Sequence, residues 1–205
     1  MSLQIDLQNI SKKHSNHYIL RDFSFVFKGP GSYAILGANG SGKSTLMKLL
    51  SGLHSPSKGD LKFQIHGNHV PVETVYQHIS LAAPWSDVIE ELTLRECISF
   101  YYTFRKPVND ININEILEIS GLKNSSDKII HHFSSGMKQR VRLLFAFLTD
   151  SEIILLDEPT SNLDATGKQW YRSLVTNYQM NRLLIVASNH LPEEYDFCKE
   201  VIELS

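Results

Sequence analysis

The sequence has no long hydrophobic run, and this absence sets the first limit on the protein. Its richest apolar stretch, residues 143–148, is far shorter than the ~20 residues that a helix needs to cross a bilayer. The chain opens on alternating residues, 5–8, rather than on the apolar segment of a signal peptide, so we expect no leader. The sequence therefore predicts no membrane-spanning helix, and any role at a membrane would need a partner.

The sequence also has few cysteines and a net charge close to zero. The 205 residues include two cysteines, Cys97 and Cys198, which are far apart and show no metal-ligand spacing. This excludes a disulfide framework, and we expect reduced, buried thiols, as in a cytosolic protein. The 20 Lys and Arg residues against 22 Asp and Glu give a formal net charge of −2. Both signs are scattered, so no nucleic-acid surface is expected.

The spacing of the hydrophobic residues changes along the chain, between the alternation typical of strands and the repeat typical of helices. Strands are predicted at residues 3–9, 23–27, 33–36, 60–65, 153–156 and 183–187. Helices are predicted at residues 44–50, 94–101, 113–119 and 137–148 and within 165–179. This order predicts an α/β fold in which a strand–helix core carries a mostly helical insert near the middle of the chain.

A glycine-rich loop follows the strand at residues 33–36 and precedes a helix. The segment Gly37, Ala38, Asn39, Gly40, Ser41, Gly42, Lys43, Ser44 and Thr45 fits the phosphate-binding pattern Gly, four residues, Gly-Lys-Ser/Thr. Three glycines let successive N–H groups turn inward toward anionic oxygens, beside a helix N-terminus. Lys43 would reach the β- and γ-phosphates, and the Ser44 hydroxyl would hold Mg²⁺. The alternative is a glycine-rich turn that binds nothing.

Two carboxylates end the apolar strand at residues 153–156. Asp157 and Glu158 follow it directly, and Pro159 comes next. Because the carboxyl ends of parallel strands meet at one edge of a sheet, both acids would emerge beside the glycine loop. Asp157 is then placed to hold Mg²⁺ through water, and Glu158 to orient or deprotonate the water that attacks the γ-phosphate. The alternative is a buried strand followed by an ordinary turn.

With the glycine loop and the carboxylates together, the chain resembles the ATP-binding-cassette (ABC) ATPases. Ser134 and Gly136 match positions of that family's signature segment, Leu-Ser-Gly-Gly-Gln, although Phe133, Ser135 and Met137 replace the other three residues. The Ser residues would also cap a helix, which is the alternative interpretation. Residues 161–164 resemble the D-loop, or else form an Asx turn, and His190 matches the switch histidine that contacts the γ-phosphate.

The chain departs from the family pattern at two positions. The resemblance implies a glutamine where the core passes into the helical insert, but Pro84 stands there, and the nearest glutamine, Gln77, lies earlier, on the expected preceding strand. The resemblance also implies an aromatic that stacks on adenine, but His14 stands at that position when residues 9–13 are matched to the family's N-terminal stretch. His17 and Tyr18 are alternative stacking residues, and a solvated loop is an alternative role for His14.

The resemblance implies a P-loop NTPase (RecA-like) core with an antiparallel β subdomain, residues 1–84 and 151–205, and a helical insert at about residues 85–150. It implies an ATPase that binds ATP and Mg²⁺, dimerises with a second ABC ATPase subunit and serves a transmembrane permease subunit from the cytoplasmic side of the membrane. In the dimer, Ser134 and Gly136 would contact the partner's ATP. The alternatives are a soluble, non-transport ABC ATPase and a hydrolysis-impaired regulatory module.

Overall fold

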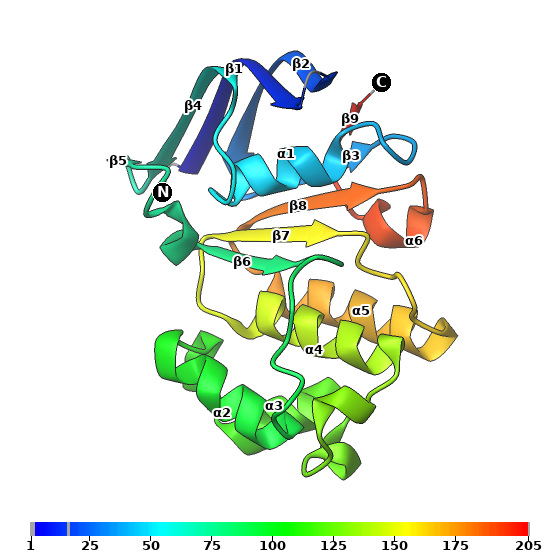
Figure 1. Ribbon diagram of the computed structural model, residues 1–205. Helices are drawn as coiled ribbons and strands as arrows, with labels where there is room; N and C mark the ends of the chain where they lie inside the picture. Colours follow the sequence, from blue (N-terminus) through cyan, green and yellow to red (C-terminus); the bar gives the residue numbers. More distant parts are fainter. Residues whose placement is uncertain (1–2, 16, 205) are drawn as a thin grey trace. The chain divides into compact units, whose positions relative to one another are not determined.

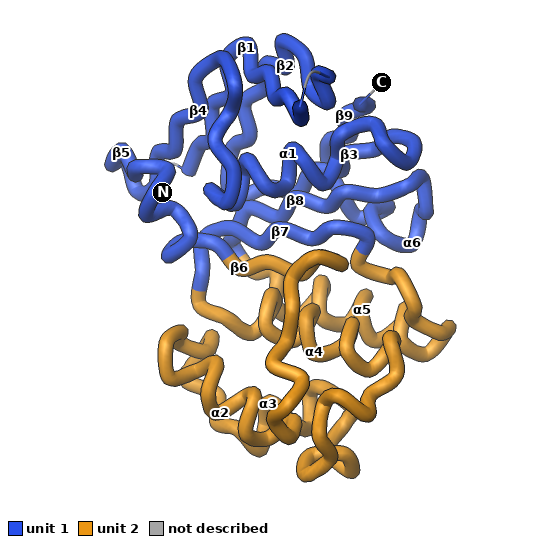
Figure 2. Tube along the Cα trace, viewed as in Figure 1, with its two compact units in different colours: residues 1–79, 151–158, 181–205 blue, residues 80–150, 159–180 orange. Residues whose placement is uncertain are grey.

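The chain passes repeatedly between two units, which Figure 2 colours separately. The computed structural model describes residues 3–15 and 17–204. Unit 1 takes residues 1–79, 151–158 and 181–205, and unit 2 takes residues 80–150 and 159–180. The expected division into a core and an insert at residues 85–150 stays a prediction, since residues 159–180 also group with the insert.

The alternating segments near the N-terminus form an antiparallel sheet in unit 1 (Figure 1). Its order is β2-β1-β4-β5, with bounds Leu3–His14 for β1, His17–Gly29 for β2, Lys58–Ile65 for β4 and Asn68–Val70 for β5. Ile5 pairs with Phe27 on one side and Phe63 on the other, and all three side chains are buried. The alternation therefore marks the buried face of the sheet.

A parallel sheet forms the second layer of unit 1. The strands of this sheet that belong to unit 1 run in the order β7-β8-β3-β9, with bounds Gly31–Leu36 for β3, Ile153–Asp157 for β7, Leu183–Ser188 for β8 and Glu200–Glu203 for β9. Every residue of β7 and β8 is buried, as expected for strands covered on both faces. The predicted strands at residues 33–36, 153–156 and 183–187 are confirmed.

Helix α1 (Lys43–Leu50) lies between the two sheets of unit 1. Its apolar residues, Leu46, Met47, Leu49 and Leu50, are all buried, and the helix contacts β7 and β8 as well as β2 (Figure 1). A short helix, α6 (Pro192–Tyr195), contacts β8. The glycine loop is thus held at the carboxyl edge of the parallel sheet by a helix buried on two sides.

The connection out of unit 1 corrects one expectation. Gln77 lies in the 3₁₀ helix η1 (Val75–His78), and the strand β6 begins only afterwards (Ile79–Ala82). Its expected place on a strand is therefore wrong, because successive 3₁₀ backbone bonds, such as Gln77 N–H to Thr74 O at 3.1 Å, replace an extended conformation.

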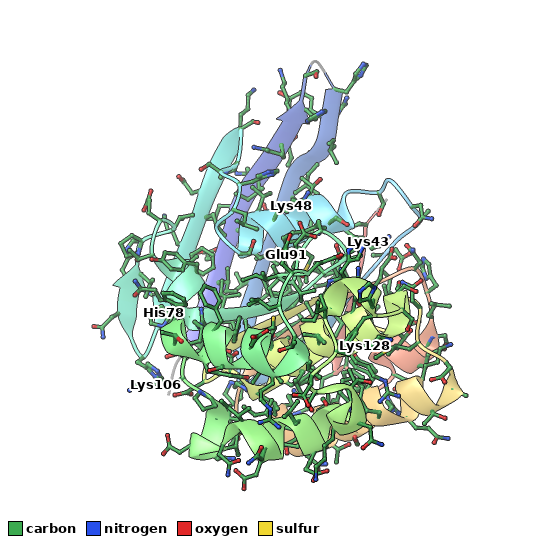
Figure 3. The ribbon with its side chains drawn as sticks, turned by 60° about the horizontal axis from the view of Figure 1, so that its bottom comes forward. Lys43, Lys48, His78, Glu91, Lys106 and Lys128 are labelled. Atoms are coloured by element: carbon green, nitrogen blue, oxygen red, sulfur yellow. The ribbon has the colours of Figure 1, made fainter. Side chains whose placement is uncertain are left out.

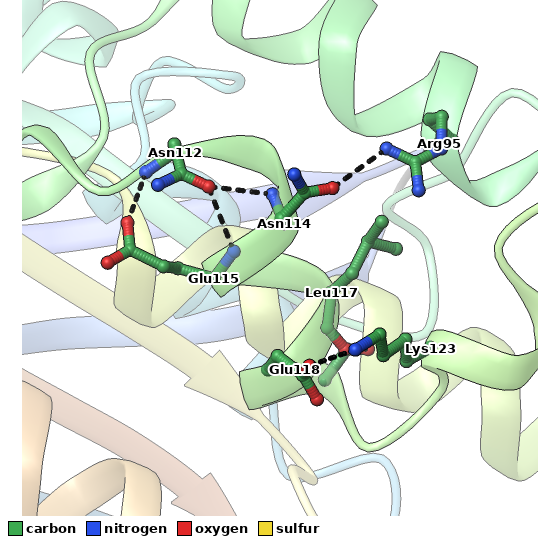
Figure 4. A network of polar contacts seen from close by, with 8 residues as sticks. Arg95, Asn112, Asn114, Glu115, Leu117, Glu118 and Lys123 are labelled. Carbon is green, nitrogen blue, oxygen red and sulfur yellow. Dashed lines mark hydrogen bonds and ion pairs between the residues drawn. The ribbon is translucent and has the colours of Figure 1, made fainter.

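Unit 2 is mainly helical, and capping side chains mark the starts of its α-helices. The α-helices are α2 (Leu94–Phe104), α3 (Ile113–Ser120), α4 (Ser135–Leu148) and α5 (Ala165–Tyr178), with 3₁₀ turns η2 (Val108–Asp110), η3 (Lys123–Ser125) and η4 (Ile130–His132). Thr93 with Glu96, and Asn112 with Glu115, form reciprocal capping boxes, the second of which Figure 4 shows. Figure 4 also shows the bond from Arg95 to Asn114.

An apolar core joins the helices of unit 2. Ile98, Leu117, Leu144 and Leu148 are among its buried members. Cys97 is buried there as expected, whereas Cys198 in unit 1 is half-buried, and neither forms a disulfide. Burial raises the pKa of the Cys198 thiol to about 12, so it stays protonated near neutral pH. No helix within residues 3–15 and 17–204 is long and apolar enough to span a membrane.

Candidate functional site

Several predicted site residues follow the carboxyl ends of three neighbouring strands of unit 1, so they lie at one edge of the parallel sheet. In the register of the parallel sheet, Leu36 of β3 lies opposite Ser188 of β8, and Asp157 of β7 lies opposite Ala187. The segments that follow these strand ends begin with Gly37, Asn189 and Glu158. The parallel topology alone therefore gathers a glycine loop, an amide and a carboxylate.

The glycine loop has the shape and the free donors of a phosphate site. Gly42 has a φ of +100°, and a Cβ at this position would lie 3.0 Å from the Ile19 carbonyl oxygen, so the turn requires glycine. Gly42 is the N-cap of α1 and provides no side-chain cap, which leaves the first N–H groups of the helix open toward the loop. The Ser41 Oγ is buried and has no hydrogen-bond partner among the described residues. These groups fit the oxygens of a polyphosphate.

Lys43 is folded onto its own loop. The side chain is 4% exposed, and Figure 3 labels it at the start of α1. Its Nζ donates to Gly37 O at 2.6 Å, to Ala38 O at 3.0 Å and to Asn189 Oδ1 at 2.5 Å. An ammonium group has three donors, so these three neutral acceptors use all of them.

Asn189 joins the lysine to the predicted catalytic carboxylate. While its Oδ1 accepts from Lys43, its Nδ2 donates to Glu158 Oε1 at 2.6 Å. Glu158 has a φ of +49°, in the left-handed region that non-glycine residues rarely adopt, and its N–H donates to Ala187 O at 2.9 Å. Lys43, Asn189 and Glu158 therefore form one hydrogen-bonded row. Sequence reasoning missed Asn189, and its only signal was its place at the end of a buried strand.

The predicted magnesium ligands are an alcohol and a buried carboxylate. Asp157 is 1% exposed at the end of β7, and Ser44 lies exposed in the first turn of α1. Across the part of the chain that the structure describes, no group of three or more His, Cys, Asp or Glu side chains is arranged to hold a metal. An all-oxygen pair of this kind suits Mg²⁺, which usually keeps waters and takes further ligands from substrate phosphates.

His190, the predicted γ-phosphate contact, lies beside the carboxylate of Glu203. Its Nε2 is 3.2 Å from Glu203 Oε1, and both side chains are about half exposed. The residue has a φ of +60° at the end of β8. The amide of Asn189, and not the imidazole of His190, contacts Glu158 in this structure. The role of His190 at the γ-phosphate stays a prediction.

A cavity of about 290 Å³ adjoins the glycine loop on the side of β2, and its walls include Tyr18, Ile19 and Ser41. The Lys13 Nζ and the Arg21 guanidinium lie 4.5 Å and 5.1 Å from the centre of the Tyr18 ring. Desolvation would raise the pKa of Tyr18, but Lys13 and Lys58 hold it below the ordinary value. His14 is exposed at the end of β1. Tyr18 lines this cavity, and which of these residues contacts the base stays a prediction.

In unit 2 the signature segment forms the start of α4. Ser134 is the N-cap, and its Oγ accepts from Met137 N–H at 3.2 Å. A Cβ on Gly136 would lie 2.6 Å from the Asn162 carbonyl oxygen, so glycine is needed where these two segments touch. Asp164 caps α5 by accepting from Gly167 N–H at 2.7 Å. The signature and D-loop segments are thus in contact at the starts of two helices.

Sequence comparison finds similar proteins along nearly all of the chain. The profile of the ABC transporter family matches residues 20–161. The lantibiotic transport ATP-binding protein SrtF of Streptococcus pyogenes is 27% identical over 97% of this chain and 85% of its own length. The Nod factor export ATP-binding protein I of Rhizobium leguminosarum bv. viciae is 29% identical over 93% of this chain and 62% of its own length.

Solved structures have the same fold at lower identity. A dimeric ATP-binding cassette in a post-hydrolysis state, bound to ADP and Pi, superposes with a TM-score of 0.83 at 22% identity, over 98% of this chain and 94% of the other. A bacterial Atm1-family ABC exporter with ATP bound gives a TM-score of 0.84 at 20% identity, over 100% of this chain and 38% of the other. The expected α/β fold with a P-loop NTPase core is therefore confirmed.

Proposed function

Since the chain belongs to the ABC transporter family, as the match over residues 20–161 shows, we propose that it is the ATP-hydrolysing subunit of a transporter. It would act from the cytoplasmic side on a separate membrane subunit. The observation that carries this proposal is the row of Lys43, Asn189 and Glu158 beside an open glycine loop. In this row the Lys43 ammonium, which would bind phosphate, and the Glu158 carboxylate, which would activate water, lie at one edge of the sheet, and this supports the proposal.

Each site residue has one task in the proposed reaction. The loop N–H groups and Ser41 bind the phosphates, and Lys43 leaves its carbonyl partners to neutralise the γ-phosphate. Ser44 and Asp157 would hold Mg²⁺, which supplies further charge neutralisation when bound. Glu158 accepts a proton from the attacking water, and Asn189 holds the carboxylate in place.

The proposed active unit is a dimer. Ser134 and Gly136 lie at the N-terminal end of α4, where open N–H groups favour an anion, and in the dimer they would contact ATP held by a second ABC ATPase subunit. Closing of this dimer would complete two ATP sites around a two-fold axis, and hydrolysis would open the dimer again.

A groove in unit 2 is the proposed docking surface for the membrane subunit. It has a volume of about 340 Å³, and its walls include Phe100, Phe104 and Ile89, which are 48%, 72% and 40% exposed. Exposed apolar side chains gathered in this way favour a binding partner. Arg105, Arg142 and Asp87 also line the groove, so two guanidinium groups face one carboxylate, and we expect an amphipathic segment of the membrane subunit that carries a carboxylate.

Removal of magnesium tests the proposed activity. We expect the chain, co-purified with its membrane subunit, to release phosphate from ATP in Mg²⁺ and to lose at least about 100-fold of that rate in excess EDTA, because Mg²⁺ neutralises the transferred phosphoryl group. Phosphate release is measured before and after Mg²⁺ is restored. Absence of turnover in Mg²⁺ with the membrane subunit present would contradict the proposal.

Asn189 supplies a second prediction. Replacing it with Leu, which has a similar size but no amide, should lower kcat by about 10-fold, since Glu158 loses the donor that orients it. KM for ATP should change much less than kcat. Asn181→Leu, at an exposed turn residue, is the matched control. Equal kcat for Asn189→Leu and wild type would remove the positioning role.

A further inference from the structure

Pro84, which stands where the family resemblance implies a glutamine, belongs to a closed turn. Ser86 N–H donates to Ala83 O at 3.0 Å, and Ser86 Oγ donates to the same oxygen at 2.7 Å. Ala83 N–H in turn donates to Ser86 Oγ at 3.0 Å. Proline presets φ at the second position of such a turn. The three bonds and the proline together fix the position of the Ser86 carbonyl.

Arg142 connects this turn to the interior of α4. Its Nε donates to Ser86 O at 2.7 Å, and its Nη1 donates to Gln139 Oε1 at 3.3 Å. Arg142 and Gln139 are three residues apart, so they lie on the same face of the helix. The guanidinium fork holds both acceptors at once, which a single ammonium would not do with the same geometry.

Gln139 extends this chain of hydrogen bonds to the backbone next to Glu158, the proposed catalytic carboxylate. The residue is 2% exposed, and its Nε2 donates to Pro159 O at 3.0 Å. Pro159 directly follows Glu158 in the chain. Because an unpaired amide is costly inside a protein, Gln139 is expected to follow both of its partners when either one moves.

We infer that the Ala83–Ser86 turn, Arg142 and Gln139 form a link that couples the docking groove to the backbone at Glu158. Arg142 is a wall of the groove and a member of the hydrogen-bond chain at the same time. A segment that enters the groove meets the same guanidinium that holds Ser86 and Gln139. This inference rests on the proposed function, and coupling of this kind acts equally in both directions.

Reciprocity allows a test with ATP as the only ligand. In a Glu158→Gln background, which should still bind ATP without hydrolysing it, we expect Mg²⁺ with ATP to slow hydrogen exchange of the amides at residues 86–89 by about 5-fold. Adding Arg142→Met should reduce this effect to less than about 2-fold, and Gln139→Met should do the same. The double variant should show the same reduction of the ATP effect as either single variant, because the two substitutions break the same link. Exchange is measured by mass spectrometry.

Arg95→Met is the matched control, because Arg95 is also a helical arginine of unit 2 but bonds Asn114 Oδ1 at 3.1 Å. It should keep the full effect of ATP. Thermal unfolding and the amount of retained ATP are recorded for every variant. Full protection in Arg142→Met, or ATP retention without any change at residues 86–89, overturns the link and leaves the proposed function standing. Failure to retain ATP overturns both.

Discussion

Replacing Glu158 with Gln is expected to lower ATP turnover by at least about 100-fold, the range of a lost general base. An amide accepts no proton from the attacking water, but its oxygen still accepts from Asn189 Nδ2, as the carboxylate does. The phosphate-binding loop is unchanged by this substitution, so ATP should still bind. Phosphate release and nucleotide retention are measured on the same preparation.

The same variant should accumulate as an ATP-bound dimer, because closure is no longer followed by hydrolysis. Size-exclusion chromatography in Mg²⁺ with ATP measures this state. Glu118→Gln is the control, since Glu118 pairs with Lys123 on the surface of α3 (Figure 4) and such pairs contribute little. A Glu158→Gln protein that turns over ATP at the wild-type rate would remove Glu158 from the reaction.

Replacing Lys43 with Ala should weaken ATP binding by at least about 100-fold. The substitution removes the cation that would lie against the phosphates, and a few kcal/mol of charge-assisted hydrogen bonds correspond to a change of that size. Isothermal titration with ATP and Mg²⁺ measures the loss.

Lys48→Ala is the control for that variant, because Lys48 lies later on the same helix and outside the glycine loop (Figure 3). It should bind ATP as the wild type does. Thermal unfolding of Lys43→Ala separates lost affinity from lost structure, since Lys43 also joins two loop carbonyls to Asn189. Wild-type affinity in Lys43→Ala would show that ATP binds elsewhere.

Local signals in the sequence were sufficient to predict most of the helices and strands. Thr93 with Glu96 and Asn112 with Glu115 cap their helices within three residues, so short-range chemistry fixed both starts. β1 was predicted too short because its alternation breaks at Asn9, which has a φ of +51° beside a shift in register. The strand continues to His14 because β2 pairs with it beyond that point.

The interactions that the sequence did not reveal are long-range and polar. Asn189 contacts Lys43 and Glu158, which lie 146 and 31 residues away, and Arg142 reaches a carbonyl 56 residues away. An isolated Asn or Arg carries no periodic signal, since its partner is set only when strands and helices have packed. The glycine loop was readable because its donors and its helix lie next to each other in sequence.

The three bonds of the Lys43 ammonium have a consequence for what the site accepts. Loading the site is an exchange, because an incoming ligand must replace two carbonyls and an amide oxygen that already hold the cation. A neutral nucleoside offers that cation nothing better than its present partners, whereas a triphosphate offers several charged oxygens. In the resting loop, the two carbonyls and the amide oxygen thus compete weakly with an incoming ligand for the Lys43 ammonium. A ligand with a higher density of negative charge displaces them more readily.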